Sequence, residues 1–189
     1  MMKKSLLALS LLAALPVLGL SAAASAAEGV SYNYVEGGYI ASKISGPDAD
    51  GWAIGGSAAI APNFHVFGNY SSQTVDNTNF DIDNWRLGVG YNHEIGPKTD
   101  LLTRVAYERY ETGVQNFNGY SVEAGVRSGF TPNWEGYALA GYEDGSDFDG
   151  DFYGRLGTQV KFNPHWSASG EVKFIDGDAQ YFVGPRYTF

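Results

Sequence analysis

Three histidines are the side chains of this chain best suited to acid–base chemistry: His65, His93 and His165. Hydrolytic sites place a histidine within hydrogen-bond reach of a serine nucleophile or an aspartate. All three histidines stand beside proline turns, whereas most aspartates gather in a different set of connections. In a sheet protein the length of a strand separates these two sets, so they cannot meet in one cluster. We therefore expect no enzymatic activity.

The acidic run DGSDFDGD at 144–151 has the composition of a calcium-binding loop. Asp147, Asp149 and Asp151 alternate along it, and carboxylate oxygens are the ligands that Ca²⁺ prefers. The run departs from an EF-hand loop, because Gly150 comes before the third acid and Thr158 stands where the final glutamate belongs. These aspartates are weak candidates for a metal site, and the sequence predicts no cofactor.

The chain opens with an expected export signal over residues 1–27. Two lysines precede an apolar run at 6–20, and a stretch of small residues follows at 21–27. The apolar run is shorter than the roughly 20 residues of a membrane-spanning helix, and it ends in an Ala-Ser-Ala triplet of the type that signal peptidase cuts. Cleavage is expected after Ala26 or Ala27, and residues 28–189 are expected to form one domain.

The composition indicates strands. The chain contains 25 Gly, 13 Tyr, 11 Phe and 4 Trp, and it contains no Cys. Aromatic residues suit strands, and glycine relieves crowding where the wall of a barrel curves. Without cysteine, neither a disulfide framework nor a cysteine-linked lipid anchor is available. The net charge of −9 argues against nucleic acid as a partner.

Prolines recur at positions 62, 97, 132 and 164, at separations of 35, 35 and 32 residues. A fixed period of this kind indicates a repeated supersecondary unit. Because a longer polar connection lies between successive prolines, each unit contains two strands. The count predicts an all-β fold, a ten-stranded antiparallel up-and-down transmembrane β-barrel. The expected strands are 31–41, 52–60, 64–73, 84–94, 100–111, 119–130, 134–143, 151–162, 166–175 and 180–189.

Five of the expected strands alternate cleanly between apolar and polar residues. In one of them, Trp85, Leu87 and Val89 point to one side while Arg86 and Gly88 point to the other. The faces of the first and seventh strands are ambiguous and stay unassigned. The polar faces predict a network of charges inside the barrel, made of Arg86, Arg104, Glu108, Glu123, Arg127, Arg155, Lys161, Glu171, Lys173 and Arg186.

Alternation alone does not separate a membrane barrel from a soluble, lipocalin-like barrel, in which the apolar face points inward. The apolar faces of most strands begin and end with aromatic residues, as at Trp85 and Tyr91 or at Trp166 and Phe174. Two interfacial girdles of aromatic residues require this pattern. The polar faces carry both signs of charge among many small residues, which suits a crowded lumen. The sequence therefore favours the membrane barrel.

The aromatic end of the last strand is similar to the C-terminal signal by which the bacterial barrel-assembly machinery recognises its clients. Gly184, Tyr187 and the terminal Phe189 resemble this C-terminal signal, whereas Phe182 and Pro185 depart slightly from it. We expect the assembly machinery to act on this chain during biogenesis.

Six segments of the chain are similar to segments of a known family: SYNYVEGGY at 31–39, APNFHVFG at 61–68, GYSVEAGVRS at 119–128, EGYALAGYED at 135–144, FYGRLGTQVKFNP at 152–164 and the ending YFVGPRYTF. In these segments the sequence resembles the Ax-type family of small outer-membrane proteins of plant- and soil-associated gamma-proteobacteria. The resemblance covers essentially the whole mature chain and implies an outer-membrane barrel linked to biofilm and motility behaviour. It brings no catalytic or cofactor residues with it, and the likeness to the OmpX and OmpA small-barrel group extends only to architecture.

An even number of strands places both termini on one side, which is periplasmic in bacterial barrels. The proline turns would then be periplasmic and the polar connections would face the outside. An acidic outer surface could bind divalent cations shared with lipopolysaccharide, attract basic partners, or simply keep the loops hydrated. Eleven of the twelve aspartates lie in or beside these connections: Asp48, Asp50, Asp76, Asp81, Asp83, Asp144, Asp147, Asp149, Asp151, Asp176 and Asp178.

These features together predict a monomeric outer-membrane barrel with a structural or surface-interaction role in envelope integrity, adhesion or biofilm-related contact. Its expected partners are outer-membrane lipid, lipopolysaccharide and the assembly machinery. The alternative is a narrow porin-like channel for water or small ions, because ten strands lie close to the limit below which side chains fill a barrel. The short connections do not favour a preformed pocket for a small molecule.

Overall fold

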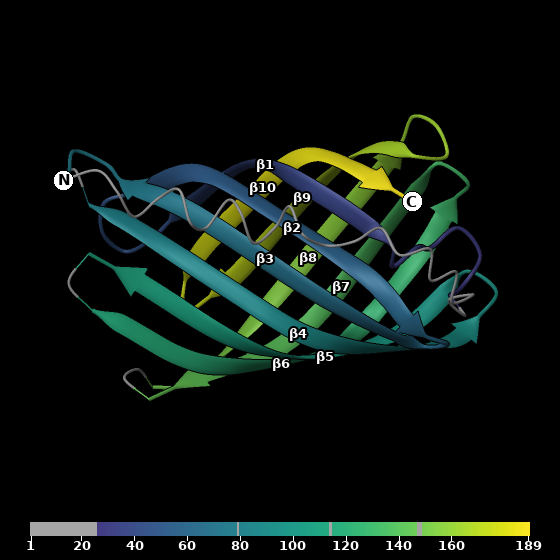
Figure 1. Cartoon of the computed structure of the whole chain (residues 1–189), viewed down its shortest axis with the longest axis horizontal. Helices are drawn as coiled ribbons and strands as arrows, with labels where there is room; N and C mark the ends of the chain where they lie inside the picture. Colours follow the sequence, from purple (N-terminus) through teal and green to yellow (C-terminus); the bar gives the residue numbers. More distant parts are fainter. Residues whose placement is uncertain (1–25, 79, 114, 147–148) are drawn as a thin grey trace.

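The computed structural model describes residues 26–78, 80–113, 115–146 and 149–189. Over these residues, ten antiparallel strands close into one barrel in which β1 pairs with β10 (Figure 1). The prediction of an all-β, ten-stranded antiparallel barrel is confirmed. The strands are β1 (Tyr34–Lys43), β2 (Ala49–Ala61), β3 (Phe64–Val75), β4 (Asp81–Gly96), β5 (Thr99–Thr112), β6 (Asn116–Thr131), β7 (Trp134–Gly145), β8 (Asp151–Lys161), β9 (Trp166–Ile175) and β10 (Asp178–Thr188).

Most of the expected export signal, residues 1–25, lies outside the described residues, so the signal stays a prediction. Within the described ranges, no helix is long and apolar enough to cross a membrane.

Three of the proline turns share one local structure. Two residues, at 62–63, 97–98 and 132–133, connect consecutive strands, and the pairing register shifts just before each turn. Asn63 has a φ of 68°, in the left-handed region that asparagine tolerates better than most residues. The period of about 35 residues in the sequence therefore reflects a repeated tight turn with a repeated β-bulge.

The two ends of the barrel differ in their connections. We call the end with the connections 62–63, 97–98, 132–133 and 162–165 the turn end, and the end with the longer polar connections the loop end. The chain enters β1 and leaves β10 at the turn end, where Tyr34 pairs with Thr188. Both ends of the barrel domain therefore lie on the same side.

Several strands are longer than the sequence predicted. β4 and β6 each have 16 residues and extend beyond the expected 84–94 and 119–130. At the loop end the extra residues, 81–83 and 116–118, mix polar and apolar side chains and continue the hydrogen-bonded ladder, as where Thr74 pairs with Asp81. The strands therefore project past the apolar band at the loop end, which leaves shorter connections than the composition suggested.

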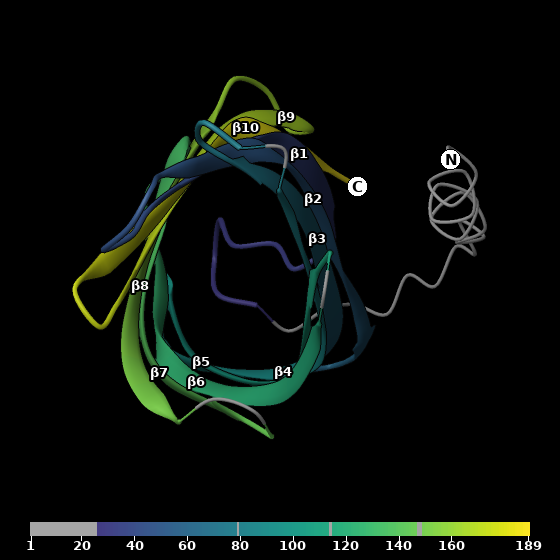
Figure 2. The same cartoon turned by 90° about the vertical axis from the view of Figure 1, so that its left-hand side faces the viewer.

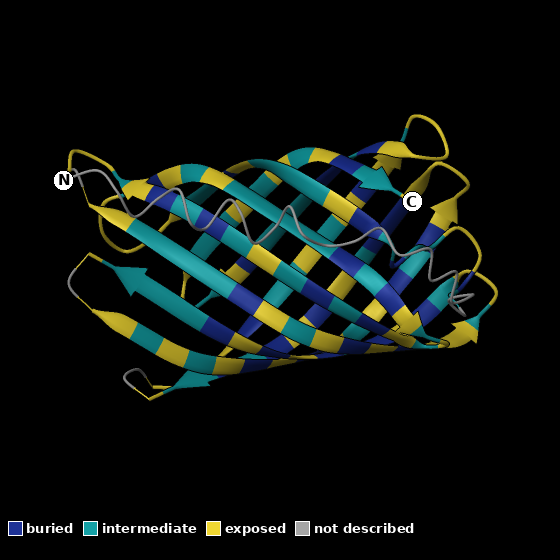
Figure 3. Ribbon diagram, viewed as in Figure 1, coloured by how far each residue is buried: buried dark blue, intermediate teal, exposed yellow. Residues whose placement is uncertain are grey.

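Buried and exposed residues alternate along the strands (Figure 3). The exposed positions carry the large apolar side chains. Leu87 is 68% exposed and Phe152 is 77% exposed, whereas Arg127 is only 2% exposed. A soluble barrel would bury the aliphatic residues and expose the arginine. The observed arrangement is the one that a lipid solvent selects, since hydrocarbon accepts the aliphatic surface and excludes charge.

Aromatic side chains form a belt near each end of the barrel. Toward the loop end, Tyr70 lies 5.2 Å from Trp52 and 4.3 Å from Trp85 between ring centroids. Toward the turn end, the rings of Trp166 and Tyr187 are 5.1 Å apart. Amphipathic rings at two levels are what the interfaces on both sides of a membrane favour.

Glycines on the inner face make room for large rings from the neighbouring strand. Gly157 pairs with Tyr137, and a Cβ at Gly157 would lie 2.1 Å from that tyrosine ring. Gly90 pairs with His65 in the same way, again with 2.1 Å to the imidazole. The combination of many glycines and many aromatics in the composition is therefore a consequence of packing inside a curved wall.

The structure corrects the expected start of the first strand. The sequence pattern predicts a strand from residue 31, but β1 begins at Tyr34. The preceding segment, residues 26–33, runs inside the ring of strands (Figure 2), where Ala27 and Tyr32 are 2% and 0% exposed. We call residues 26–33 the N-terminal segment. It packs against Leu102 and Leu139 and forms an apolar cluster within the lumen.

Candidate functional site: the barrel lumen

Glu123 lies at the centre of an ionic network in the middle of the lumen. Its carboxylate is 3.0 Å from Arg86 and 3.0 Å from Arg155, and it accepts a hydrogen bond from the hydroxyl of Tyr153. Arg104 approaches the same carboxylate to 3.9 Å. The Glu123 side chain is fully buried, so its charge depends on these partners rather than on water.

The network extends across the barrel from Glu123. Arg86 also pairs with Glu108 at 3.1 Å, and Arg155 pairs with Glu171 at 2.5 Å. The register of the strands fixes part of this geometry, because Arg86 stands directly opposite Glu108 on the neighbouring strand. Each guanidinium therefore meets carboxylates from two sides, which repays much of the cost of removing these charges from water.

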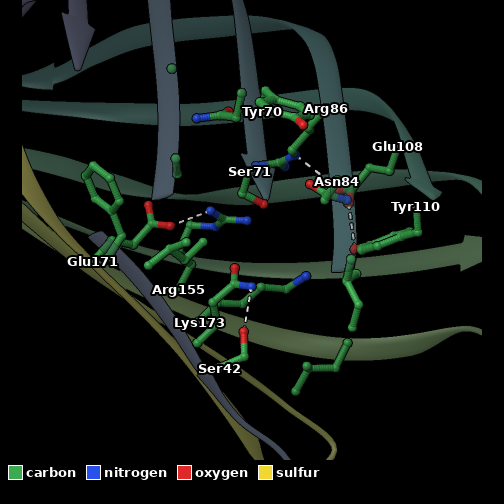
Figure 4. A pocket seen from close by; sticks show the side chains of 18 of the residues that line it. Ser42, Tyr70, Ser71, Asn84, Arg86, Glu108, Tyr110, Arg155, Glu171 and Lys173 are labelled. Atoms are coloured by element: carbon green, nitrogen blue, oxygen red, sulfur yellow. Dashed lines mark hydrogen bonds and ion pairs between the residues drawn. The ribbon is translucent and has the colours of Figure 1, made fainter. Parts of the chain in front are cut away.

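A cavity of about 570 Å³ lies above this network, toward the loop end. Figure 4 shows Arg155 and Glu171 pointing toward one another at its wall, with Lys173 and Ser42 nearby. Lys173 pairs with Glu143 at 2.5 Å, and Arg186 pairs with Glu36 at 2.7 Å. The cavity wall therefore carries both signs of charge, largely matched in pairs.

The size of this cavity changes an expectation from the sequence. The short connections argued against a pocket, but the space lies within the barrel, between strands, and not among the loops. Its volume falls in the range of about 300–1,000 Å³ that small-molecule pockets occupy. Residues at the loop-end limits of the strands, including Ile44, Thr112 and Asp178, contribute to its lining, so the cavity reaches the mouth of the barrel.

The turn-end half of the lumen is filled by the N-terminal segment. The ring of Tyr32 stacks on the ring of His65, with centroids 4.5 Å apart. The guanidinium of Arg127 lies over the Tyr32 ring, 5.0 Å from its centroid. The Tyr32 hydroxyl donates to Asp100 at 2.9 Å. Burial raises the pKa of the Tyr32 phenol above its ordinary value, so the hydroxyl stays a donor at physiological pH.

Glu135 holds the charges of this half together. It forms ion pairs with Arg127 and, at 3.3 Å, with Lys161. Lys161 also donates to the backbone oxygen of Gly29, which links the wall to the N-terminal segment. The Glu135 carboxylate thus lies between Arg127 and Lys161, close to the stacked Tyr32 ring, and these side chains fill this part of the lumen.

The structure places the charges that the sequence assigned to the lumen on the inner face, and it pairs them. Other members of the network were missed, namely Glu36 on β1 and Glu135 and Glu143 on β7. These glutamates lie on the two strands whose faces the alternation left unassigned. Tyr32 and Asp100 were missed as well, because residues 31–33 continue the strand pattern and Asp100 stands beside a proline turn.

The histidines lie near the turn end, as their positions beside the prolines predicted, but in different surroundings. His65 is fully buried against Tyr32, whereas His93 and His165 are exposed. A ring nitrogen of His165 lies 2.9 Å from the backbone oxygen of Thr188. These positions do not place the three imidazoles in one cluster.

The acidic connections at the loop end carry local hydrogen bonds. Asp151 accepts from the N–H of Phe152 at 2.7 Å, Asp149 is exposed, and Asp147 lies outside the described residues. Over the described part of the chain, no three histidine or acidic side chains gather in a group suited to a metal ion. Asp48 pairs with Lys43 at 2.8 Å across the connection between β1 and β2.

The C-terminal residues lie at the turn end, on the outer face. Tyr187 contacts the rings of His165 and Trp166, and Phe189 is 57% exposed with its N–H donating to the backbone oxygen of Asn33. Gly184 faces β1, where a Cβ would lie 2.1 Å from the oxygen of Gly37. The strand-closing pair β1–β10 therefore tolerates only glycine at this position.

A closed barrel with an apolar exterior, aromatic belts and a paired ionic interior is an integral outer-membrane barrel. The sequence matches the family described as the outer membrane protein beta-barrel domain over residues 11–182, and the chain belongs to this family. Proteins of this class sit in outer-membrane lipid and are inserted by the barrel-assembly machinery.

Among solved structures, the chain is similar to the KdgM porin, with a TM-score of 0.50 and 14% identity over 82% of this chain and 99% of that chain. It is also similar to Neisserial surface protein A, with a TM-score of 0.44 and 15% identity over 84% and 98% of the two chains. Likeness at these identities shows the barrel fold alone. No curated protein matches the sequence.

Proposed function

We propose that this protein is a closed outer-membrane barrel. Its wall holds it in the membrane, and its acidic loop end contacts other molecules. In this proposal both termini and the proline turns are periplasmic, and the loop end faces the outside of the cell. The role is structural or interactive, in envelope integrity, adhesion or biofilm-related contact, and the protein acts as a monomer.

The observation that carries the proposal is the obstruction of the lumen. A continuous path for ions would have to pass the Glu123 network and then the N-terminal segment around Tyr32. Glu123 and Tyr32 are both buried, and their neighbours are bound to one another rather than free to rotate. An ion path would therefore require breaking several buried charge pairs at once, each of which is costly to disrupt.

Conductance in planar lipid bilayers tests this proposal directly. The purified protein should insert without discrete openings, and a variant lacking residues 27–33 should conduct more than the unaltered chain. Heat modifiability on gels controls for folding, because a folded barrel migrates differently before and after boiling. Stable discrete openings of the unaltered protein would contradict the closed barrel.

A narrow channel is the second candidate, and the cavity of about 570 Å³ at the loop end favours it. The loop-end half of the lumen is already hollow. If the N-terminal segment were displaced, the Glu123 network would be the one remaining barrier that we identify along the lumen of the described residues. Openings that appear only under voltage and that vanish when the segment is held in place would support this candidate.

The acidic loop end supports a role in surface contact. Asp76, Asp149 and Asp176 are exposed there, and basic partners or divalent cations shared with lipopolysaccharide suit such a surface. The whole-chain resemblance to the Ax-type proteins, which are linked to biofilm behaviour, agrees with this role.

Adhesion of expressing cells to a polylysine-coated surface tests the role in contact. Replacing Asp76, Asp149 and Asp176 with Asn should weaken adhesion, and Mg²⁺ should compete with it. Glu94→Gln, at an exposed position near the turn end, is the matched control and should leave adhesion unchanged. Equal loss in both variants would argue against an outward-facing loop end.

Gly184, Tyr187 and Phe189 are proposed as the signal for the assembly machinery. Their support is the C-terminal pattern and the outward position of Phe189 beside the turn end. Phe189→Ala should reduce the yield of heat-modifiable barrel in the outer membrane, while the purified variant should still refold in detergent. Unchanged yield in cells would remove this residue from the signal.

A further inference from the structure

Asp100 differs from the other aspartates of this chain. It is fully buried, at the start of β5 beside the Pro97 turn, whereas the others lie in or near the polar connections. Its Oδ1 accepts a hydrogen bond from the backbone nitrogen of Ala27 at 3.1 Å, and its Oδ2 accepts from the hydroxyl of Tyr32 at 2.9 Å. Both donors belong to the N-terminal segment.

Among the described residues Asp100 forms no ion pair, although Arg127 stands opposite it on β6. Its nearby cation, Arg127, forms its ion pair with Glu135 and lies over the Tyr32 ring instead. A buried carboxylate with only neutral donors keeps a large desolvation cost, which the other buried acids of this lumen avoid through arginine or lysine. The Asp100 carboxylate thus accepts hydrogen bonds from two neutral donors, and the cation opposite it is paired with another carboxylate.

A cation arises at this position if the export signal is removed after Ala26. We propose that signal peptidase cleaves between Ala26 and Ala27, and that the new α-ammonium group of Ala27 binds Asp100 as a buried ion pair. Water adds across this peptide bond, so Ala26 leaves with the new carboxylate and Ala27 keeps the nitrogen as an ammonium. With a typical α-amino pKa of about 7.7–8.0, this group is cationic at neutral pH.

The alternative cleavage after Ala27 does not serve the site in this way. The nitrogen of Glu28 donates to the backbone oxygen of Pro97 at 3.0 Å, which is a neutral acceptor. Asp100 would also lose the Ala27 nitrogen, one of its two donors. The triplet Ala24-Ser25-Ala26 has small residues at the positions that signal peptidase requires, so the sequence permits the first cut equally well.

The pair would couple processing to closure of the barrel. Ala27 is 2% exposed inside the lumen, and Asp100 is the acceptor of its nitrogen, so an ammonium at this position has Asp100 as its anionic partner. The same carboxylate holds Tyr32, whose ring fills the turn-end half of the lumen against His65. Cleavage therefore creates the charge that fixes the N-terminal segment in place. This inference does not depend on whether the barrel conducts.

The intact mass of the protein purified from outer membranes gives the first test. We expect a mature chain that begins with Ala27. A chain that begins with Glu28, or one that keeps the signal, would overturn the proposal.

Acetylation of the α-amine tests the ion pair itself. In the folded protein at pH 7, N-hydroxysuccinimidyl acetate should modify the Ala27 amine at least about tenfold more slowly than in the urea-denatured protein, as expected for a group reached only through local opening. Peptide mass spectrometry locates the acetyl group. Equal rates in the folded and denatured protein would overturn the ion pair.

Asp100→Asn supplies the matched comparison, with the exposed Asp50→Asn as its control. The amine should become more reactive in the folded Asp100→Asn variant and stay protected in Asp50→Asn. Protection that is unchanged in a heat-modifiable Asp100→Asn barrel would overturn the role of Asp100. If this variant does not fold, the mass and the protection of the unaltered protein still decide the proposal.

Discussion

The two halves of the lumen are filled in different ways. At the turn end, the N-terminal segment and the apolar cluster of Tyr32, Leu102 and Leu139 fill the space, and the charges around Glu135 are enclosed. At the loop end, a cavity of about 570 Å³ remains, and its charges are paired along the wall. A ten-stranded wall is slightly too wide for side chains alone to fill. The chain therefore adds its own N-terminal segment to close one half and leaves the other half open.

The largest difference between the halves should appear when one carboxylate of an ion pair is removed. Glu135→Gln leaves Arg127 enclosed without its partner, and we expect a loss of about 3–5 kcal/mol in the free energy of unfolding. Glu143→Gln releases Lys173 at the wall of the cavity, where water can replace the carboxylate, so we expect about 1 kcal/mol. Urea unfolding in lipid vesicles, followed by tryptophan fluorescence, measures both. Equal losses would break the distinction between a packed half and a hollow half.

Truncation of an inward aliphatic side chain gives a smaller contrast of the same kind. Leu102→Ala should cost about 2–5 kcal/mol, because Tyr32 and Leu139 surround the space that it vacates. Ile40→Ala enlarges a cavity that already exists, so we expect about 1–2 kcal/mol, close to the transfer term alone. The same unfolding assay compares them. A larger loss for Ile40→Ala would show that the loop-end half is filled in solution.

The smallest effect is expected at the mouth of the loop end. Lys43 and Asp48 form an exposed ion pair at 2.8 Å, which water and salt screen. Lys43→Ala should leave the unfolding midpoint unchanged within error, at low salt and at high salt alike. A clear loss of stability would mean that the connections contribute to the barrel and are more than a hydrated surface.

The wall of the barrel could be predicted from the sequence because lipid favours apolar side chains and the lumen favours polar ones, at alternate positions of each strand. Leu87 and Arg86 are adjacent in the chain and face different solvents, so the alternation is sharp and gives the strand directly. The proline turns then gave the strand count, because each one repeats the same bulged turn.

The filling of the lumen could not be predicted in this way. Ile40 and Leu139 are apolar and point inward, so β1 and β7 do not separate apolar from polar faces. The inward position of Tyr32 could not be predicted either. Its neighbours extend the period of β1, and nothing local distinguishes a residue that continues a strand from one that enters the lumen. Only the closed barrel brings Tyr32 to Asp100, which is 68 positions away in the sequence.

Thiol accessibility tests the difference between the halves most directly, since the chain contains no cysteine of its own. Ser71 and Ser167 are both buried inner residues, 7% and 2% exposed, and of the two Ser71 is the one that lines the cavity. In the purified, folded protein, a charged maleimide should label Ser71→Cys rapidly and Ser167→Cys only after denaturation. Rapid labelling of Ser167→Cys in the folded barrel would contradict a lumen that is closed at its turn end.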